Sequence, residues 1–148
     1  MKLASALQYT LPGVPCVYYG DEAGMEGFED PFNRKCYPWG SADKALITWY
    51  KKLGAVRKNE REVFAHGRYC GIDTESGVMF FKRKADDDVV YVVVNNSGSD
   101  YNPVLPEGEY TDLLTYEPFS GTVKDKGVAV VKLTNETTFP VKRGRKKK

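Results

Sequence analysis

Val89-Val-Tyr-Val-Val-Val94 is the stretch that decides the fold of this chain, because every residue in it is β-branched or aromatic. Successive side chains of a strand point to opposite faces, so a run without polar residues is buried on both faces. Turn-forming residues lie on either side, with Asp86-Asp-Asp88 before the run and Asn95-Asn-Ser-Gly98 after it. We therefore predict a central strand of a β-sandwich.

Short runs of the same kind recur along the second half of the chain, separated by turn signals such as Thr74-Glu-Ser-Gly77 and Pro106-Glu-Gly108. The other candidate strands are Arg68–Ile72, Val78–Arg83, Gly108–Asp112, Thr122–Val123, Val128–Leu133 and Thr138–Lys142. Six or seven short strands within about 80 residues are typical of an antiparallel sandwich. We predict such an all-β domain over residues 63–142.

The first 62 residues have a different character. Leu3–Tyr9 is typical of the end of a helix, and Val14–Tyr19 is a short apolar run bounded by Pro/Gly and Gly, which predicts a buried parallel strand. Gly20 to Gly40 has no periodicity and is interpreted as a long functional loop. A helix then follows, with Ser41 as the expected cap and Asp43 in the first turn. Its apolar stripe is Leu46, Trp49, Tyr50, Leu53 and Val56.

One parallel strand cannot form a domain by itself, because its backbone donors and acceptors have no neighbouring strand to pair with. A strand, loop and helix in this order are one unit of a parallel α/β architecture, in which ligands bind beyond the carboxyl ends of the strands. We therefore expect residues 1–62 to be the last part of a larger α/β protein, followed by the all-β domain.

Charge and cysteine content limit the possible partners and compartments. The net charge is +2, but six of the last seven residues are basic, so the rest of the chain sums to +2 − 6 = −4. We interpret residues 143–148 as a basic disordered tail; a nucleic-acid site or nuclear address is the alternative, and no nucleic-acid-binding motif supports it.

Cys16, Cys36 and Cys70 are odd in number and lack CxxC spacing, which favours reduced thiols in the cytoplasm over a disulfide framework or a zinc site. No apolar run approaches the ~18 residues of a membrane span.

Carboxylates are the only abundant catalytic residue type near the loop: Asp21, Glu22, Glu26, Glu29 and Asp30. Glycosidases use two carboxylates, but Asp21 and Glu22 are adjacent, so they point in different directions and are interpreted as bonding to backbone and neighbouring cations. His66 is the only histidine, and no nucleophile motif accompanies it. The loop's Asp, Arg, Asn, Tyr and Trp residues nevertheless suit a sugar, whose hydroxyls take paired hydrogen bonds and whose C–H face stacks on aromatic rings.

The chain resembles the α-amylase family, glycoside hydrolase family 13. Residues 10–25, Thr-Leu-Pro-Gly-Val-Pro-Cys-Val-Tyr-Tyr-Gly-Asp-Glu-Ala-Gly-Met, resemble the eighth barrel strand and its loop, and Asp30-Pro-Phe-Asn-Arg-Lys-Cys-Tyr-Pro-Trp39 is similar to the neopullulanase, cyclomaltodextrinase and maltogenic amylase branch. Leu46–Leu53 resembles the eighth helix, and the remainder, including Leu105–Leu114, resembles the C-terminal β-sandwich. The resemblance implies the last βα unit of an incomplete (β/α)8 TIM barrel followed by an antiparallel sandwich.

The resemblance also implies what each part does. The family's catalytic Asp, Glu and Asp lie before Met1, so no catalytic residue, metal ligand or cofactor is assigned, and the chain is expected to be inactive alone. Asp30 and Arg34 match a segment that contacts glucose units, with Arg34 donating to hydroxyls and Asp30 orienting it. Tyr37 and Trp39 are candidates for stacking, with packing of the loop as the alternative. The expected partner is an α-glucan oligosaccharide or cyclodextrin bound through the missing barrel, and a homodimer is possible in the full-length family; neither membrane nor nucleic acid is expected. A stand-alone carbohydrate-binding or regulatory module is the alternative function.

Overall fold

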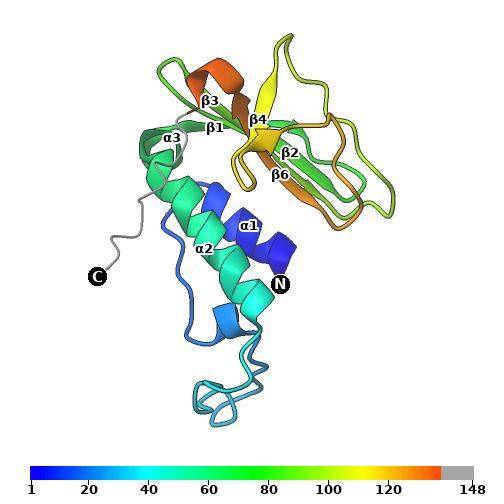
Figure 1. The fold of residues 1–148 in the computed structure, drawn as a ribbon. Coiled ribbons are helices and arrows are strands. Elements are labelled where there is room, and N and C mark those ends of the chain that lie inside the picture. The colour runs from blue at the N-terminus through cyan, green and yellow to red at the C-terminus, as the bar shows by residue number, and fades with distance from the viewer. Residues whose placement is uncertain (138–148) are drawn as a thin grey trace, which may run out of the picture.

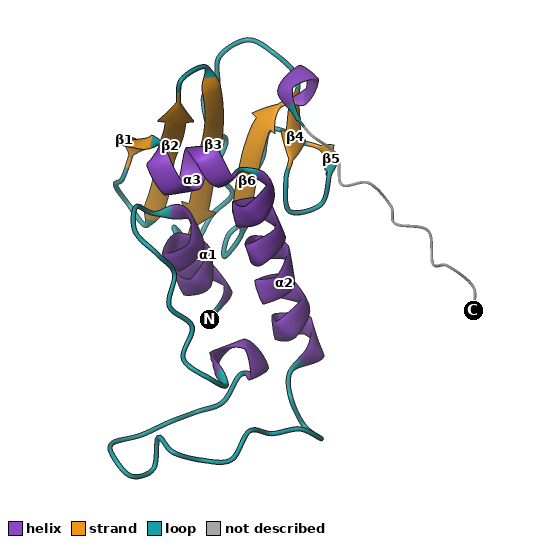
Figure 2. Cartoon of the chain, turned by 90° about the vertical axis from the view of Figure 1, so that its left-hand side faces the viewer, coloured by secondary structure: helices purple, strands orange, loops and turns teal. Residues whose placement is uncertain are grey.

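The computed structural model describes residues 1–137, which form a helical layer against one face of a β-sheet (Figures 1 and 2). Helices α1 and α2 lie side by side, and α3 connects them to the sheet. The helical elements are α1 (Lys2–Thr10), η1 (Asp21–Ala23), α2 (Lys44–Asn59), α3 (Arg61–His66) and η2 (Thr134–Glu136). None of the helices in residues 1–137 is long and apolar enough to cross a membrane.

The sheet has six antiparallel strands in the order β1-β2-β3-β6-β4-β5. Its strands are β1 (Arg68–Asp73), β2 (Val78–Ala85), β3 (Asp88–Asn95), β4 (Tyr110–Asp112), β5 (Glu117–Pro118) and β6 (Val128–Leu133). Strand β3 lies inside the sheet between β2 and β6, and Val90, Val92 and Val93 are fully buried. The predicted central strand is therefore confirmed.

The two faces of the sheet are buried against different parts of the chain. On one face, Phe81 and Val92 pack with Ala6 of α1, Leu53 of α2 and Phe64 of α3. The opposite face, around Phe80 and Val93, is covered by a loop that includes Tyr101 and Leu105. Strand alternation explains this, because neighbouring residues such as Phe80 and Phe81 face opposite sides.

The second layer of the predicted sandwich is not a sheet in residues 1–137. Within residues 1–137, the one β-bridge of the loop that covers that face pairs Tyr101 with Val123, and it is all that forms of the predicted strand Thr122–Val123. The predicted strand Thr138–Lys142 and the basic tail 143–148 lie outside the described residues. The sequence patterns located the buried strands β2, β3 and β6 but could not assign the strands to one sheet or two.

The predicted buried strand Val14–Tyr19 is wrong. This segment has no strand partner among the described residues, Val14 is 90% exposed, and Cys16 is exposed rather than buried as a small apolar side chain. A parallel strand forms only when neighbouring strands accept and donate its backbone hydrogen bonds. Here the segment is held by single side chains, with Gln8 donating to the Cys16 carbonyl and Arg57 donating to the Gly13 carbonyl.

Helix α2 begins two residues later than a cap at Ser41 would require. Asp43 is the N-cap residue, and its Oδ1 accepts hydrogen bonds from the backbone nitrogens of Ala45 and Leu46 at 2.8 and 2.9 Å. The predicted apolar stripe is confirmed. Its members other than Trp49 are buried, and Trp49 is partly buried against the core cluster that contains Leu53. Its indole nitrogen donates to the Ser5 hydroxyl of α1 at 3.0 Å.

Two buried cations join the helices to the sheet. Arg83 of β2 is 1% exposed and donates to the carbonyls of Thr10, Phe64 and Gly67. Lys132 of β6 bonds to Glu60, between α2 and α3, at 3.0 Å. Helix α3 spans the predicted domain boundary at residues 62 and 63, and the division of the chain into two domains stays a prediction.

Candidate functional site

The candidate site is the loop between η1 and α2, at the end of the molecule away from the sheet (Figure 2). Gly20, which comes directly before η1, has φ +93°, a left-handed conformation that glycine adopts without strain. A side chain at this position would also collide with Met25, whose backbone nitrogen donates to the Gly20 carbonyl at 2.9 Å. The turn is therefore closed by backbone contacts that only glycine permits.

Asp21 and Glu22 hold this turn. The Asp21 carboxylate accepts a hydrogen bond from the Tyr18 nitrogen at 3.2 Å, and the Glu22 carboxylate accepts one from the Gly20 nitrogen at 3.1 Å. Both carboxylates bond to backbone nitrogens of their own turn. The predicted bonding of these two residues to the backbone is therefore confirmed.

Asp30 and Arg34 form an ion pair at the far end of the loop. Arg34 Nε lies 2.7 Å from Asp30 Oδ1, and the two side chains are 70% and 58% exposed, respectively. Within residues 1–137, the terminal nitrogens of Arg34 have no hydrogen-bond partner. The structure thus brings these two predicted site residues together, with the guanidinium oriented by the carboxylate and its outer nitrogens available to a ligand.

Tyr37 and Trp39 lie in contact but in different environments. Their ring centroids are 4.7 Å apart with an interplanar angle of 54°. Trp39 is 88% exposed, whereas Tyr37 is half-buried, and burial together with the nearby Glu22 carboxylate raises the pKa of its hydroxyl. Tyr37 therefore packs the loop onto η1, and Trp39 presents an open aromatic face to solvent.

Lys35 and Tyr19 hold the loop together, and no sequence pattern predicts either role. Lys35 Nζ donates to the Glu26 carbonyl at 3.1 Å and lies 5.5 Å from the ring centroid of Phe28. The Tyr19 hydroxyl donates to the Lys35 carbonyl at 2.8 Å. These contacts span residues 9 to 16 positions apart, so only the folded loop reveals them.

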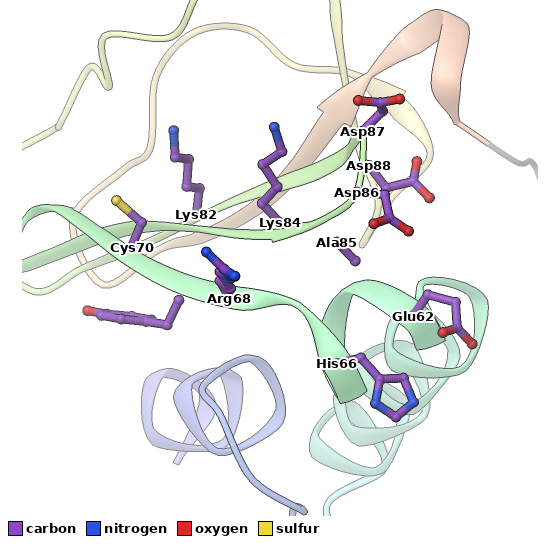
Figure 3. Close-up of a pocket in the computed structure, with 11 residues that line it drawn as sticks. Glu62, His66, Arg68, Cys70, Lys82, Lys84, Ala85, Asp86, Asp87 and Asp88 are labelled. Carbon is purple, nitrogen blue, oxygen red and sulfur yellow. The ribbon is translucent and has the colours of Figure 1, made fainter.

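Away from the loop, a hollow lies beside β1 and the β2–β3 turn. Its one side is lined by Arg68, Lys82 and Lys84 (Figure 3). Asp86, Asp87 and Glu62 lie at its other end, near His66. Cys70 is the only thiol lining it, and Figure 3 shows that thiol well separated from the imidazole of His66. A nucleophile and its base must lie within hydrogen-bond reach, so this hollow does not assemble such a pair.

The described residues also lack a metal centre: no group of three or more His, Cys, Asp or Glu side chains in residues 1–137 is arranged to hold an ion. The loop itself carries side chains that can form hydrogen bonds with a ligand and stack on it. It presents one oriented guanidinium, one carboxylate and one exposed indole, which together suit a neutral polyhydroxyl ligand.

The family described as "Alpha amylase, C-terminal all-beta domain" matches residues 71–142. A cyclomaltodextrinase from Thermoanaerobacter pseudethanolicus is 40% identical over 99 residues, which cover 66% of this chain and 17% of that enzyme. An amylopullulanase from Thermoanaerobacter thermohydrosulfuricus is 35% identical over 147 residues, covering 88% of this chain and 10% of the enzyme.

A solved structure extends the match to the helical part. The α-amylase from Geobacillus thermoleovorans, complexed with acarbose, superposes with a TM-score of 0.79 at 27% identity. The match covers 92% of this chain and 33% of that one. The chain therefore spans a third or less of the length of each of these three proteins.

Proposed function

Residues 71–142 of this chain belong to the C-terminal all-β domain of the α-amylase family, and from that premise we propose that the chain is the C-terminal portion of an α-glucan-acting glycoside hydrolase. In this proposal it contributes a sugar-contacting loop and the all-β domain to hydrolysis that retains the configuration of the α-glycosidic bond. The residues that contact sugar are Asp30, Arg34, Tyr37 and Trp39.

The exposed ion pair between Asp30 and Arg34 is the observation that supports this proposal most strongly. An exposed pair contributes little to stability, so a geometry of 2.7 Å at two solvent-exposed side chains suits recognition better than folding. Vicinal hydroxyls of a glucose unit can accept two hydrogen bonds from the free edge of the guanidinium. Trp39, elsewhere on the same loop, is 88% exposed and offers an aromatic face for the apolar side of a sugar ring.

The chain by itself is proposed to be inactive. Asp21 and Glu22 bond to backbone nitrogens, and the resemblance implies that the family's catalytic carboxylates lie before Met1. The test is an assay of the purified chain on cyclodextrin, pullulan and a chromogenic maltoside, for which we expect no turnover. Hydrolysis that persists through purification and disappears in Asp21→Asn and Glu22→Gln would overturn the proposal of inactivity.

A second candidate is a stand-alone carbohydrate-binding or regulatory module. The observation that favours it is the core that the helices share with the sheet. A chain that buries its own apolar surface does not need a second polypeptide to cover that surface. Calorimetric titration with maltooligosaccharides separates the two candidates. Tight binding that Arg34→Ala abolishes supports the module, and weak binding supports a portion that acts within a larger enzyme.

A further inference from the structure

Strand β1 leaves one edge of the sheet open. It is the first strand in the order of the sheet, and in residues 1–137 only β2 pairs with it (Figure 2). Five of its six residues are exposed. The opposite edge is closed differently, because β5 has two residues and one of them, Pro118, has no backbone N–H to offer a further strand. Of the two edges, β1 is therefore the one that can accept another strand.

The hollow beside β1 lies along this open edge. Tyr69 and Cys70 both line it, although successive side chains of a strand point to opposite faces of the sheet. A hollow that reaches both faces at one strand lies beside that strand rather than above it. Tyr69 and Ile72 are 40% and 46% exposed, so two large apolar side chains stand at the edge and would be covered by a further strand.

The side chains along β1 are arranged symmetrically about Cys70. Arg68, Cys70 and Asp73 lie opposite every second residue of β2. The spacing is regular because the register skips Ile72, an extra residue that forms a bulge. Arg68 and Asp73 are therefore equally far from Cys70, lie on the same face of the sheet and carry opposite charges.

We propose that β1 pairs with β1 of a second copy of this chain, antiparallel about a twofold axis at Cys70. Antiparallel pairing reverses one strand, so Arg68 of each copy lies opposite Asp73 of the other, and Ile72 lies next to Tyr69 of the other. The two Cys70 residues face each other at the axis. The inference does not rest on the proposed function.

Charge favours a second copy over an unrelated strand. Within residues 1–137 the Arg68 side chain takes part in no hydrogen bond or ion pair. The Asp73 carboxylate is held in place, since Oδ1 accepts from the Glu75 nitrogen at 3.2 Å and Oδ2 from the Tyr101 hydroxyl at 2.8 Å. Both oxygens keep a lone pair for a guanidinium. Opposite charges directly across an antiparallel pair are favourable, and the twofold axis forms this contact twice.

The first test is sedimentation velocity of the full chain, under reducing conditions and at increasing concentrations up to the millimolar range. We expect a concentration-dependent dimer. Arg68→Glu places like charges across the pair at both sites, so the dissociation constant of the dimer should rise about tenfold or more. Arg68→Lys keeps the charge and is expected to dimerise like the wild type. Lys51→Glu, the same charge change at an exposed position on α2, is the matched control.

The second test reads the register through Cys70. In Cys16→Ser/Cys36→Ser it is the one remaining thiol, and directly opposed residues of antiparallel strands lie at a Cα separation of about 4.5 to 5.5 Å, which a disulfide can bridge. Diamide takes up the two electrons and two protons that the thiols lose as the S–S bond forms, so we expect a covalent dimer on a non-reducing gel. Adding Cys70→Ser/Lys82→Cys moves the thiols to β2, about 14 Å apart or three strand spacings, and should abolish the link.

The inference stands only if Arg68→Glu weakens the dimer and diamide links Cys70. A chain that stays monomeric at millimolar concentration overturns it and leaves the edge of β1 to a different polypeptide. A dimer that Arg68→Glu does not weaken, or in which Cys70 is not linked, also overturns it, because the two copies then meet elsewhere or in another register. A circular dichroism spectrum of Arg68→Glu that equals the wild-type spectrum excludes unfolding as the cause of a lost dimer.

Discussion

Tyr101 shows how one residue joins the covering loop to the sheet. Its hydroxyl donates to Asp73 Oδ2 at 2.8 Å, so a loop residue is bonded to the last residue of β1. Burial and the hydrogen bond to Asp73 raise the pKa of Tyr101 from 10.0 to about 12. Because the folded pKa is higher than the unfolded one, this residue stabilises the fold below pH 10, and that contribution is lost as the pH rises through 12.

We predict that Asp73→Asn lowers the pKa of Tyr101 towards its ordinary value, because the substitution removes the negative charge and leaves burial as the main remaining cause. The measurement is a titration of tyrosinate absorbance, with the Tyr101 ring signals followed by NMR to assign the change. Asp86→Asn, at the exposed β2–β3 turn, is the control and is expected to leave the titration unchanged. An unaltered Tyr101 pKa in Asp73→Asn contradicts the assignment.

Arg83 illustrates what sequence patterns miss at this scale. In Lys82-Arg83-Lys84 all three residues are basic, and nothing in the pattern separates the middle one from its neighbours. In the structure only Arg83 is buried, since alternation turns it towards the helices, where three carbonyls accept its hydrogen bonds. Those acceptors come from Thr10 of α1, Phe64 of α3 and Gly67 between α3 and β1, so only the tertiary fold brings them together.

At the scale of elements, the sequence patterns predicted the helices and strands whose apolar residues form a buried face. Strand β3 and the stripe of α2 were predicted because their partners are other elements of this chain. The predicted strand Val14–Tyr19 failed for the opposite reason, since no neighbouring strand exists in residues 1–137 to pair with it. Helix α3 and β5 are too short for periodicity to reveal, with six and two residues.

The same reasoning applies to the candidate site. The spacing of Asp30 and Arg34 placed two complementary charges four residues apart, and the folded turn joins them as an ion pair. Phe28 and Phe32 have that spacing too, but an aromatic pair in a loop is as compatible with burial as with exposure. Only the structure shows that both side chains are exposed.

The start of α2 gives a direct comparison of the expected and observed caps. We predict that Asp43→Ala lowers the free energy of unfolding by about 1 kcal/mol, because the nitrogens of Ala45 and Leu46 lose their acceptor. Ser41→Ala is the matched control and is expected to change stability by no more than a few tenths of that value. Urea denaturation of both variants is the measurement. Equal losses in the two variants, or a larger one in Ser41→Ala, would restore the cap expected from the sequence.

At the scale of the whole molecule, the helices and the sheet are parts of one core. Leu53 of α2, 1% exposed, packs in the same cluster as Ala6 of α1 and Val92 of β3. The buried bonds of Arg83 and Lys132 join the same layers. The loop from residue 13 to residue 40 contributes little to this core, as its many exposed side chains show. The buried core and the loop of the candidate site are therefore located at opposite ends of the molecule (Figure 2).

We predict from this arrangement that α1, α2 and the sheet unfold together. Leu53→Ala leaves a cavity beneath the sheet and is expected to cost 2 to 5 kcal/mol, roughly the usual range for a buried leucine. Hydrogen exchange is the measurement, and the amides of β3 should lose as much protection as those of α2. Val104→Ala, an apolar truncation at an exposed position, is expected to leave both unchanged. If Leu53→Ala releases the amides of α2 while β3 keeps its full protection, the helical part and the sheet are separate cooperative units, as the predicted domain boundary at residues 62 and 63 would require.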